Sequence, residues 1–432
     1  MRIIRTSDGD FEAFFQRIRE RGRTFDPELW SVVGRIVDDV ARRGDAALFE
    51  YTFRWDGHPV TAVTVEASPR ERREAAGQVA PEDMAILRLA AERIERFHVR
   101  QRQEGWSVSD EKGVELGQRI LPLERVGIYA PGGSASYPST VLMTAIPARI
   151  AGVGEIVLVS PSRDGQLNPL IAVAADLAGV TRIFKIGGAQ AIAALAFGTL
   201  SIPRVDKIVG PGNAYVATAK KMVFGQVAID MIAGPSEVVV IADGTGAAAF
   251  AAADLLAQAE HDELAGAVLM TPDGAYARAV ADEVDRQLAA LPRGDIAARS
   301  IEAYGAAVVT RDLDEAVALA NRFAPEHLEL MVEDPQGLLP GIRNAGAIFM
   351  GMFTPEALGD YMAGPNHVLP TGGTARFASP LGVYDFIKRT SVLAFTRDAL
   401  GRYGAQTGRF AELEGLGGHG RSVLLRRDSK KP

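Results

Sequence analysis

Two short segments of the sequence combine residue types that transfer protons or bind metals. One of them is Glu326-His327, which follows Pro325. Histidine titrates near neutral pH and a neighbouring glutamate can serve as a second base, so the pair is suited to general acid–base catalysis. The proline should restrict Ala324 to extended backbone and so fix how the chain enters the next strand. A glutamate in a structural salt bridge beside a buried histidine explains the same pair equally well.

The other segment is Gln258-x-x-His261, which falls in a predicted helix, so that both side chains project from one face. As metal ligands they would need further nitrogen or oxygen donors, for which Asp360 and His419 are the obvious candidates. Four such ligands without sulfur suit zinc or a comparable divalent ion. Glutamine is an unusual ligand, however, and the neighbours of His261 are acidic, so spacing alone favours an ordinary solvated helix face.

The composition narrows the class of protein. No cysteine occurs among the 432 residues, which excludes disulfides, thiolate metal sites and a cysteine nucleophile. The net charge of −7 argues against a nucleic-acid partner. The first ten residues hold no apolar run typical of signal peptides, and the apolar stretch Gly246–Ala259 is too short for a membrane span. We therefore expect a cytoplasmic protein without nucleic-acid or membrane partners.

The spacing of apolar residues predicts an α/β fold. Helical periodicity marks the chain up to residue 118, most clearly in 27–52 and 81–103. From Arg119, short apolar runs alternate with alanine-rich helical segments, the pattern of parallel βαβ units. The predicted strands are Val126–Tyr129, Glu155–Val159, Arg182–Ile186 and Lys207–Val209 in a first set, and Glu237–Ala242, Ala267–Thr271, Gly305–Val309, His327–Val332 and Ala347–Met350 in a second.

Glycine-rich turns at 130–133, 187–188 and 210–212 follow three strands of the first set. Such turns lie at the carboxyl ends of parallel strands, where ligands bind in open α/β sheets. We predict two similar, incomplete Rossmann-like domains with parallel sheets, a helical N-terminal region and a small helical C-terminal tail. The predicted boundaries are 1–118, 119–235, 236–376 and 377–432.

Two further patterns have simple structural explanations. The run from Asp243 to Ala249, with Gly244 and Gly246, resembles the dinucleotide fingerprint G-x-G-x-x-A after a strand. Alanine-rich helix starts meet this pattern often, so it is a weak signal. His58 and His98 lie in the charged helical region, and we expect both to be surface residues.

Eight motifs, in order and spanning nearly the whole chain, closely resemble the histidinol dehydrogenase family. They are Tyr129-Ala130-Pro131-Gly132-Gly133, Tyr137-Pro138-Ser139-Thr140-Val141-Leu142-Met143, Gly210-Pro211-Gly212-Asn213-Ala214-Tyr215-Val216, Ile232-Ala233-Gly234-Pro235-Ser236-Glu237, Gln258-Ala259-Glu260-His261-Asp262, Ala324-Pro325-Glu326-His327-Leu328, Gly364-Pro365-Asn366-His367-Val368-Leu369-Pro370-Thr371 and Glu414-Gly415-Leu416-Gly417-Gly418-His419. One such motif would be weak support, whereas eight in the family's order make a chance resemblance very improbable.

The resemblance implies a zinc- and NAD-dependent enzyme that oxidises L-histidinol to L-histidine, at the end of histidine biosynthesis. Its zinc ligands would be Gln258, His261, Asp360 and His419, which replaces the solvated-face interpretation of His261. The implied substrate contacts are Ser236, Gln258, His261, His327, Asp360, Glu414 and His419. The role of His367 stays open.

The resemblance also implies that NAD lies near Tyr129, Gln190 and Asn213, in the first α/β half. The family's cofactor site lacks the G-x-G-x-x-G fingerprint, so Gly244 and Gly246 are better interpreted as a plain helix start. Family dimers are intertwined, which implies a homodimer whose partner subunit contributes Glu414 and His419 to a shared active site.

A related branch of the family, which oxidises sulfonated diols with the same zinc motifs, is the nearest alternative. That branch usually departs around the stretch 370–377, where this chain resembles the histidinol branch. The C-terminal motif has a glycine where the family often has an alanine beside the histidine, which removes no ligand. A non-catalytic paralogue and a zinc-free Rossmann dehydrogenase that uses Gly244 and Gly246 are more distant alternatives.

The absence of cysteine bears on the mechanism. Enzymes that oxidise aldehydes to acids commonly form a cysteine thiohemiacetal, which this chain cannot do. The aldehyde must instead be hydrated, and its gem-diol oxidised as a second alcohol. We therefore expect His327 to accept protons in both oxidations and Glu326 to activate the water between them.

Overall fold

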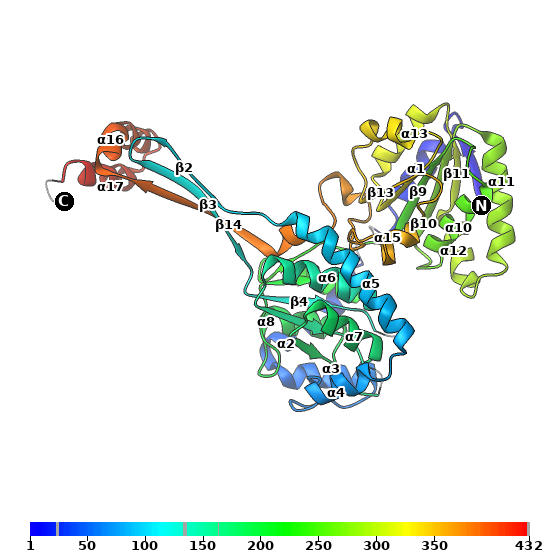
Figure 1. Ribbon diagram of the computed structural model, residues 1–432, viewed down its shortest axis with the longest axis horizontal. Helices are drawn as coiled ribbons and strands as arrows, with labels where there is room; N and C mark the ends of the chain where they lie inside the picture. Colours follow the sequence, from blue (N-terminus) through cyan, green and yellow to red (C-terminus); the bar gives the residue numbers. More distant parts are fainter. Residues whose placement is uncertain (23–25, 133–135, 163, 430–432) are drawn as a thin grey trace. The chain divides into compact units, whose positions relative to one another are not determined.

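The computed structural model describes residues 1–22, 26–132, 136–162 and 164–429, so that Gly133 of the first glycine-rich turn lies outside the described residues. The chain divides into two compact units (Figure 1). The first unit comprises residues 1–101 and 123–386, and the second comprises residues 102–122 and 387–432. The four-part division at residues 118, 235 and 376 stays a prediction.

The first unit contains a five-stranded parallel sheet with the strand order β6-β5-β4-β7-β8. Its strands are β4 (Arg125–Tyr129), β5 (Glu155–Val159), β6 (Arg182–Phe184), β7 (Lys207–Val209) and β8 (Ala228–Ile229). The apolar residues of these strands are buried on both sides, which is why they appear in the sequence as continuous apolar runs.

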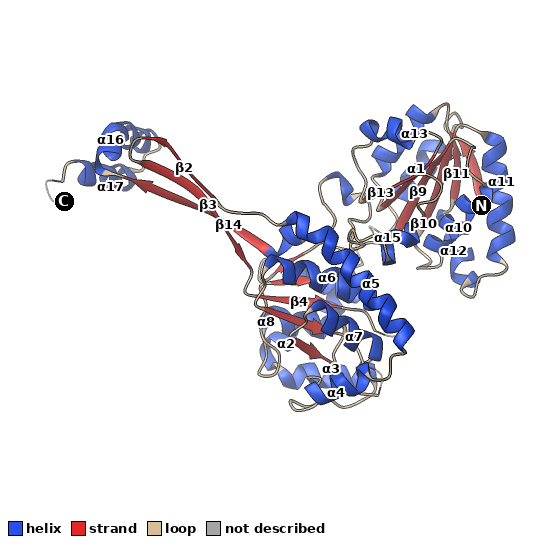
Figure 2. Cartoon of the chain, in the orientation of Figure 1, coloured by secondary structure: helices blue, strands red, loops and turns tan. Residues whose placement is uncertain are grey.

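Helices cover both faces of this sheet (Figure 2). Their bounds are α2 (Pro27–Arg43), α3 (Asp45–Asp56), α4 (Pro69–Ala76), α5 (Pro81–His98), α6 (Pro138–Ala151), α7 (Pro169–Ala178), α8 (Gly188–Phe197) and α9 (Ala214–Val223). The first four belong to the predicted N-terminal helical region, and they pack on the first α/β core rather than forming a core of their own.

A six-stranded parallel sheet forms the second core of the first unit, with the order β1-β11-β10-β9-β12-β13. Its strands are β1 (Arg2–Arg5), β9 (Glu237–Ala242), β10 (Gly266–Thr271), β11 (Ala306–Val309), β12 (His327–Met331) and β13 (Ala347–Met350). Helices α1 (Phe11–Arg19) and α13 (Leu313–Phe323) cover one face, and α10 (Ala248–Ala259), α11 (Gly274–Leu288) and α12 (Gly294–Tyr304) cover the other.

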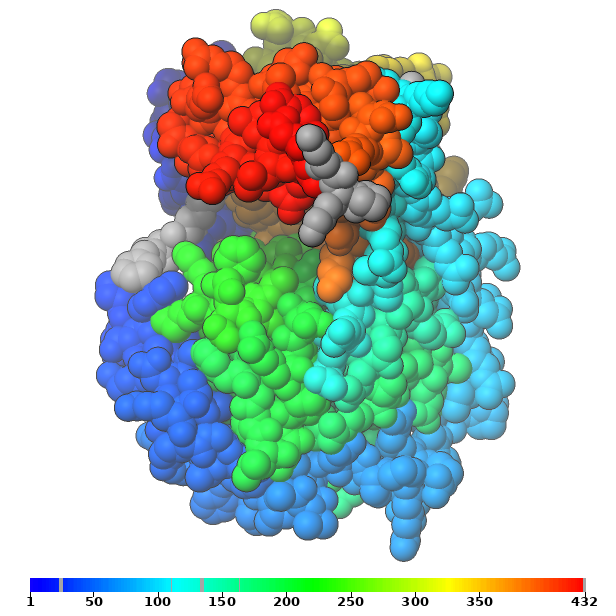
Figure 3. Space-filling view, turned by 90° about the vertical axis from the view of Figure 1, so that its left-hand side faces the viewer, coloured from blue at the N-terminus to red at the C-terminus, as the bar shows by residue number. Residues whose placement is uncertain are grey.

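The second unit combines an antiparallel sheet with two helices. The sheet has the order β14-β3-β2, formed by β2 (Trp106–Glu111), β3 (Val114–Pro122) and β14 (Ile387–Phe395). The helices α16 (Arg397–Leu413) and α17 (Gly417–Arg427) pack against each other and appear orange to red in Figure 3.

The predicted fold class is confirmed, and nine predicted parallel strands coincide with observed ones to within two residues. The main correction concerns segments that we expected to be helical but that form strands in the structure. β1, β2, most of β3 and β14 were not predicted, because they are short or largely polar and exposed. β1 pairs with β11 and β14 pairs with β3, both far away in the sequence, whereas β2 and β3 form a hairpin to which β14 adds the third strand. Local periodicity does not reveal such pairing.

Candidate active site

The candidate catalytic residues meet at the amino edge of the second sheet. Ser236 and Glu237 lie where β9 begins, and Glu326 and His327 lie where β12 begins. The two strands are parallel neighbours, with His327 opposite Val238, so both starts lie side by side. Helices α10 and α13 end at this edge, and the partial negative charge of a helix C-terminus favours a cation there.

The turn into β12 does not have the predicted backbone conformation. Pro325 was expected to keep Ala324 extended, but Ala324 has φ 54° and ψ 61°, in the left-handed region. The reason is that Ala324 caps α13, and its N–H bonds to the carbonyl of Ala320 while the chain reverses into the strand. A left-handed residue other than glycine is costly, which often marks a functional site.

Glu326 is buried just before β12, and its carboxylate is held by residues at the start of the neighbouring strand β9. Its Oε2 accepts a hydrogen bond of 3.1 Å from the backbone N–H of Glu237, and the Ser236 side chain also bonds to it. Burial raises the pKa of Glu326 well above its usual range, and the negative charges of Glu237 and Asp360 raise it further. Such a group is suited to accept and return a proton.

His327 has two ring nitrogens in different surroundings. Nδ1 lies 3.2 Å from the carbonyl oxygen of Glu237 and 3.1 Å from Oε1 of Gln258. A carbonyl oxygen only accepts, so Nδ1 carries the ring proton and Nε2 keeps its lone pair. Nε2 is buried, has no hydrogen-bond partner among the described residues, and lies 3.9 Å from Oδ1 of Asp360.

The surroundings of His327 favour its neutral form. Burial lowers the pKa of His327 to about 3, and the positive charges of His261 and His367 lower it further. The carboxylates of Glu326 and Glu356 lie 3.9 Å and 3.6 Å from Nδ1, but with a neutral ring these are not ion pairs. A neutral imidazole with a free lone pair is a proton acceptor.

Glu356, which was not predicted as a site residue, lies in the first turn of α15 (Glu356–Tyr361). The ligand atoms that His327, Glu356 and Asp360 offer all lie within 4.8 Å of one another. Burial raises the pKa of Asp360 to about 6 and that of Glu356 well above its usual range. Oε2 of Glu356 is buried and has no partner within the described ranges of the chain. The spacing of Glu356 and Asp360, four residues apart, was the available signal.

The predicted ligands Gln258 and His261 lie around the end of α10. Gln258 is buried in the last turn of the helix, and the part of the chain that the structure describes offers its Nε2 no hydrogen-bond partner. His261 lies beyond the C-cap residue Glu260, not in the helix as predicted, because its N–H bonds to the carbonyl of Gln258 in a closing turn. His261 is close enough that its charge lowers the pKa of Asp360 and of His327.

His367 is a further histidine near His327 and Asp360. Its Nδ1 lies 3.0 Å from the carbonyl oxygen of Asp360, and its Nε2 lies 3.5 Å from the Thr140 hydroxyl. Because Nδ1 must donate to that carbonyl, His367 helps to fix the backbone at Asp360. Glu414 and His419 belong to the second unit, at the end of α16 and in the first turn of α17.

The residues predicted to lie near NAD share the carboxyl edge of the first sheet. Tyr129 ends β4, and its hydroxyl accepts a hydrogen bond of 3.2 Å from the N–H of Gly188. Gln190 lies in the first turn of α8, and its buried Oε1 has no partner among the residues that the structure describes. Asn213 caps α9 by accepting a hydrogen bond from Val216 N–H. The N-termini of α8 and α9 both lie at this edge, and the N–H groups of a helix N-terminus suit a phosphate-bearing ligand.

The glycines of the fingerprint-like run have structural roles. Gly244 has φ +93°, and a Cβ on Gly246 would lie 2.8 Å from the Met331 side chain. Asp243 fixes the turn by accepting hydrogen bonds from the N–H groups of Thr245 and Glu333. The turn and its close packing therefore account for both glycines.

Our prediction that His58 and His98 are surface residues is wrong. His98 is fully buried at the end of α5, with Nδ1 2.7 Å from Oε1 of Gln101. His58 is buried against the first sheet's loops, with Nε2 3.1 Å from the Ser162 hydroxyl. Both histidines are covered by segments far away in the sequence or by packing of the helical region on the core, which a charged sequence context does not reveal.

Comparison with known proteins agrees with the motif resemblance. The family model described as histidinol dehydrogenase matches residues 19–427. A histidinol dehydrogenase of Syntrophotalea carbinolica is 59% identical over 99% of both chains, and one of Geobacter sulfurreducens is 57% identical over 99% of this chain and 100% of its own.

A crystal structure of histidinol dehydrogenase from Elizabethkingia anophelis has the same architecture. It superimposes with a TM-score of 0.92 at 37% identity, covering 99% of this chain and 98% of its own. Among the described residues, no helix is long and apolar enough to cross a membrane.

Proposed function

The chain belongs to the histidinol dehydrogenase family, and on that premise we propose how it converts L-histidinol through L-histidinaldehyde to L-histidine. The observation that carries the proposal is the buried, unpartnered Nε2 of His327, beside Glu326 and the carboxylates of α15. A proton acceptor held in this way suits an alcohol that must lose a proton as it is oxidised.

His327 accepts the hydroxyl proton at Nε2 in the first oxidation and the gem-diol proton in the second. Its Nδ1–H stays bonded to the Glu237 carbonyl, which fixes the ring and the tautomer. NAD accepts a hydride in each oxidation. Each proton transfer by a positioned base contributes roughly 10²–10⁴-fold to the rate.

Glu326 removes a proton from the water that adds to the aldehyde between the two oxidations. Its carboxylate is held by the N–H of Glu237 and the Ser236 side chain, so it keeps one orientation. The burial that raises its pKa makes it a stronger base than an exposed glutamate. No cysteine is available for the alternative thiohemiacetal route.

The donor set around α10 and α15 fits zinc. Gln258, His261 and Asp360 would hold the ion together with His419 of the partner subunit, and all four offer nitrogen or oxygen. The shared acidic neighbourhood of Glu356 and Asp360 and two helix C-termini support a cation here. When bound, zinc would orient the substrate through its imidazole and amino groups.

The remaining contacts complete the proposal. Ser236, Gln258, His261, His327, Asp360, Glu414 and His419 contact the substrate, and NAD lies near Tyr129, Gln190 and Asn213. The protein acts as a homodimer in which Glu414 and His419 reach the partner's active site. Exposed large apolar side chains on α16 and α17 support an association of this kind, among them Phe410 and Leu413. A cytoplasmic location is part of the proposal.

A substrate panel tests the activity. We expect NADH to form with L-histidinol, at two NADH per histidine, and not with a sulfonated diol. The reverse preference would assign the chain to the related branch. Removal of the metal with a chelator should abolish histidinol binding and spare NAD binding, both measured by calorimetry. Full turnover by metal-free protein would contradict the zinc site.

A further inference from the structure

Arg21 is a buried cation just after helix α1, and three of its hydrogen bonds reach residues at the amino edge of the second sheet. Nη1 donates to the Ile18 carbonyl at 2.8 Å and Nε to the Leu264 carbonyl at 3.0 Å. Nη2 donates to the Ser236 carbonyl at 3.3 Å and to Oε2 of Glu237 at 2.6 Å. Arg21 thus ties three distant segments together.

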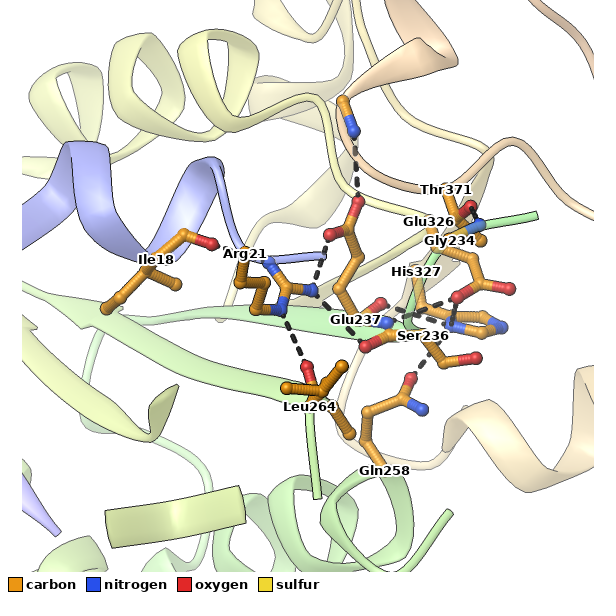
Figure 4. A network of polar contacts seen from close by, with 12 residues as sticks. Ile18, Arg21, Gly234, Ser236, Glu237, Gln258, Leu264, Glu326, His327 and Thr371 are labelled. Atoms are coloured by element: carbon orange, nitrogen blue, oxygen red, sulfur yellow. Dashed lines mark hydrogen bonds and ion pairs between the residues drawn. The ribbon is translucent and has the colours of Figure 1, made fainter. Parts of the chain in front are cut away.

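Glu237 connects Arg21 with the proposed catalytic pair (Figure 4). Its side chain bonds to Arg21, and both side chains are 1% exposed. Its backbone N–H donates to Glu326, and its carbonyl accepts from Nδ1 of His327. Glu237 therefore binds Arg21 through its side chain and holds Glu326 and His327 through its backbone N–H and carbonyl groups.

The neighbouring backbone leaves room for the guanidinium. A Cβ on Gly266, the first residue of β10, would lie 2.6 Å from Cζ of Arg21. Gly22 has φ +70°, and a Cβ there would lie 2.5 Å from the Pro235 ring. Both glycines permit the segment after α1 to lie directly against residues 235–237.

Stability alone is a poor reason for this arrangement. Burying two charges costs several kcal/mol of hydration, and apolar replacement of a buried ion pair is often neutral or stabilising. The Arg21–Glu237 pair does, however, fix the position of the backbone groups that hold Glu326 and His327. A misplacement of about 1 Å in such a site can cost about 100-fold in rate.

We propose that Arg21 is a positioning residue of the reaction. Through Glu237 and the Ser236 carbonyl it fixes the first residues of β9, and thereby the orientation of Glu326 and of the His327 ring. Arg21 touches neither substrate nor cofactor in this assignment. The inference rests on the proposed roles of Glu326 and His327.

Two variants separate positioning from stability. Gly266→Ala keeps both charges but pushes the guanidinium away, and Arg21→Met/Glu237→Met replaces the pair by apolar side chains. For both we expect kcat for histidinol and for histidinaldehyde to fall about 10- to 100-fold. The KM for NAD should stay unchanged, and the double variant should keep a Tm near that of the parent. Gly154→Ala is the matched control, because its Cβ would meet only the Glu124 carbonyl at 3.5 Å.

Arg21→Lys keeps the charge but not the fork of donors, so it should restore only part of kcat relative to Arg21→Met. If the double variant and Gly266→Ala both turn over at the parent rate, Arg21 has no positioning role. If Glu326→Gln and His327→Asn turn over at the parent rate, the proposed roles fail instead, whatever the Arg21 variants do. The two failures are thereby distinguished.

Discussion

At the scale of single residues, the hydrogen bonds of His327 decide which of its nitrogens can react. The Glu237 carbonyl accepts a hydrogen bond from Nδ1–H, which leaves Nε2 as the acceptor beside Asp360. The neutral ring is maintained by burial. The Glu326 carboxylate accepts a hydrogen bond from the N–H of Glu237 and provides a second base beside His327. Two bases in one site suit a reaction that removes protons from an alcohol and from water.

Glu326→Gln should separate the two oxidations. Glutamine keeps the size of the side chain and can accept from Glu237 N–H, but it cannot take a proton from water. We expect kcat with histidinaldehyde to fall roughly 10²–10⁴-fold, and NADH formation in the first oxidation to fall far less. Stopped-flow measurement of each half-reaction checks this. Equal losses in both would refute the division of roles between Glu326 and His327.

At the scale of elements, a buried ion pair fixes the loop between β7 and α9. Lys220 on α9 bonds to Asp230, which also accepts from Gly210 N–H at 2.7 Å. Lys220 donates to the Gly210 carbonyl at 2.8 Å, so this glycine is held at both ends. Gly210 has φ +109° and lies against the Tyr129 carbonyl, where a Cβ has no room.

Lys220→Met should therefore weaken both the fold and the NAD site. It leaves Asp230 buried without its cation, which costs about 3–5 kcal/mol. We expect a lower Tm and a higher KM for NAD with little change in the KM for histidinol. Lys221→Met is the control. Lys221 lies on α9 next to Lys220, but its side chain is exposed and lies over the ring of Trp30 on α2. An unchanged KM for NAD in folded Lys220→Met would contradict the link to the cofactor site.

The packing of α10 on β12 adds a pH dependence to stability. Burial raises the pKa of Asp254 on α10 to about 6, and Asp254 bonds to Glu329 on β12. An unfolded aspartate titrates near pH 3.9, so the folded chain binds this proton more tightly. The resulting stabilisation is complete below about pH 4 and is lost as pH rises through about 6.

Asp254→Asn tests this dependence, because asparagine stays neutral at every pH. The Tm of the parent minus that of the variant should fall between about pH 4 and 6 and level off above. Calorimetry at several pH values measures the difference, from which the titrations of groups remote from Asp254 cancel, so that it reports on Asp254 together with its partner Glu329. A difference that stays constant from pH 4 to 8 would show that the proton on Asp254 does not contribute.

At the scale of the whole molecule, the proposed shared active site has a direct genetic consequence. The expected residues fall in both units, with His327 in the first and His419 in the second. In an intertwined dimer, one site takes its first unit from one chain and its second unit from the other. Two inactive variants can then complement each other.

Mixing His327→Asn with His419→Asn subunits should restore about one quarter of the sites, because half the dimers are mixed and each has one intact site. Either variant alone should have no activity, since each lacks one residue in both sites. NADH formation after co-refolding or co-expression measures the recovery. No recovery, with mixed dimers demonstrated by native mass spectrometry, would show that each site is built from one chain.

Much of the fold followed from the sequence because its signals are local. Runs such as Glu237–Ala242 are buried on both faces, and their apolar continuity predicts a strand in a parallel sheet. The strand β14, Ile387–Phe395, is largely exposed and forms by pairing with β3, more than 250 residues earlier. Its own residues do not show this, so the tail appeared helical.

Residue identities alone show which reactive groups the chain has: two bases at Glu326-His327, nitrogen and oxygen donors for a metal, and no thiol. The order of its motifs indicates the histidinol dehydrogenase family. These depend on residue identity and order alone. Only the tertiary structure decided which nitrogen of His327 is free, that Glu356 joins it, and that Arg21 reaches Glu237. Each of these depends on residues far apart in the chain brought together by strand order and burial, which local spacing does not encode.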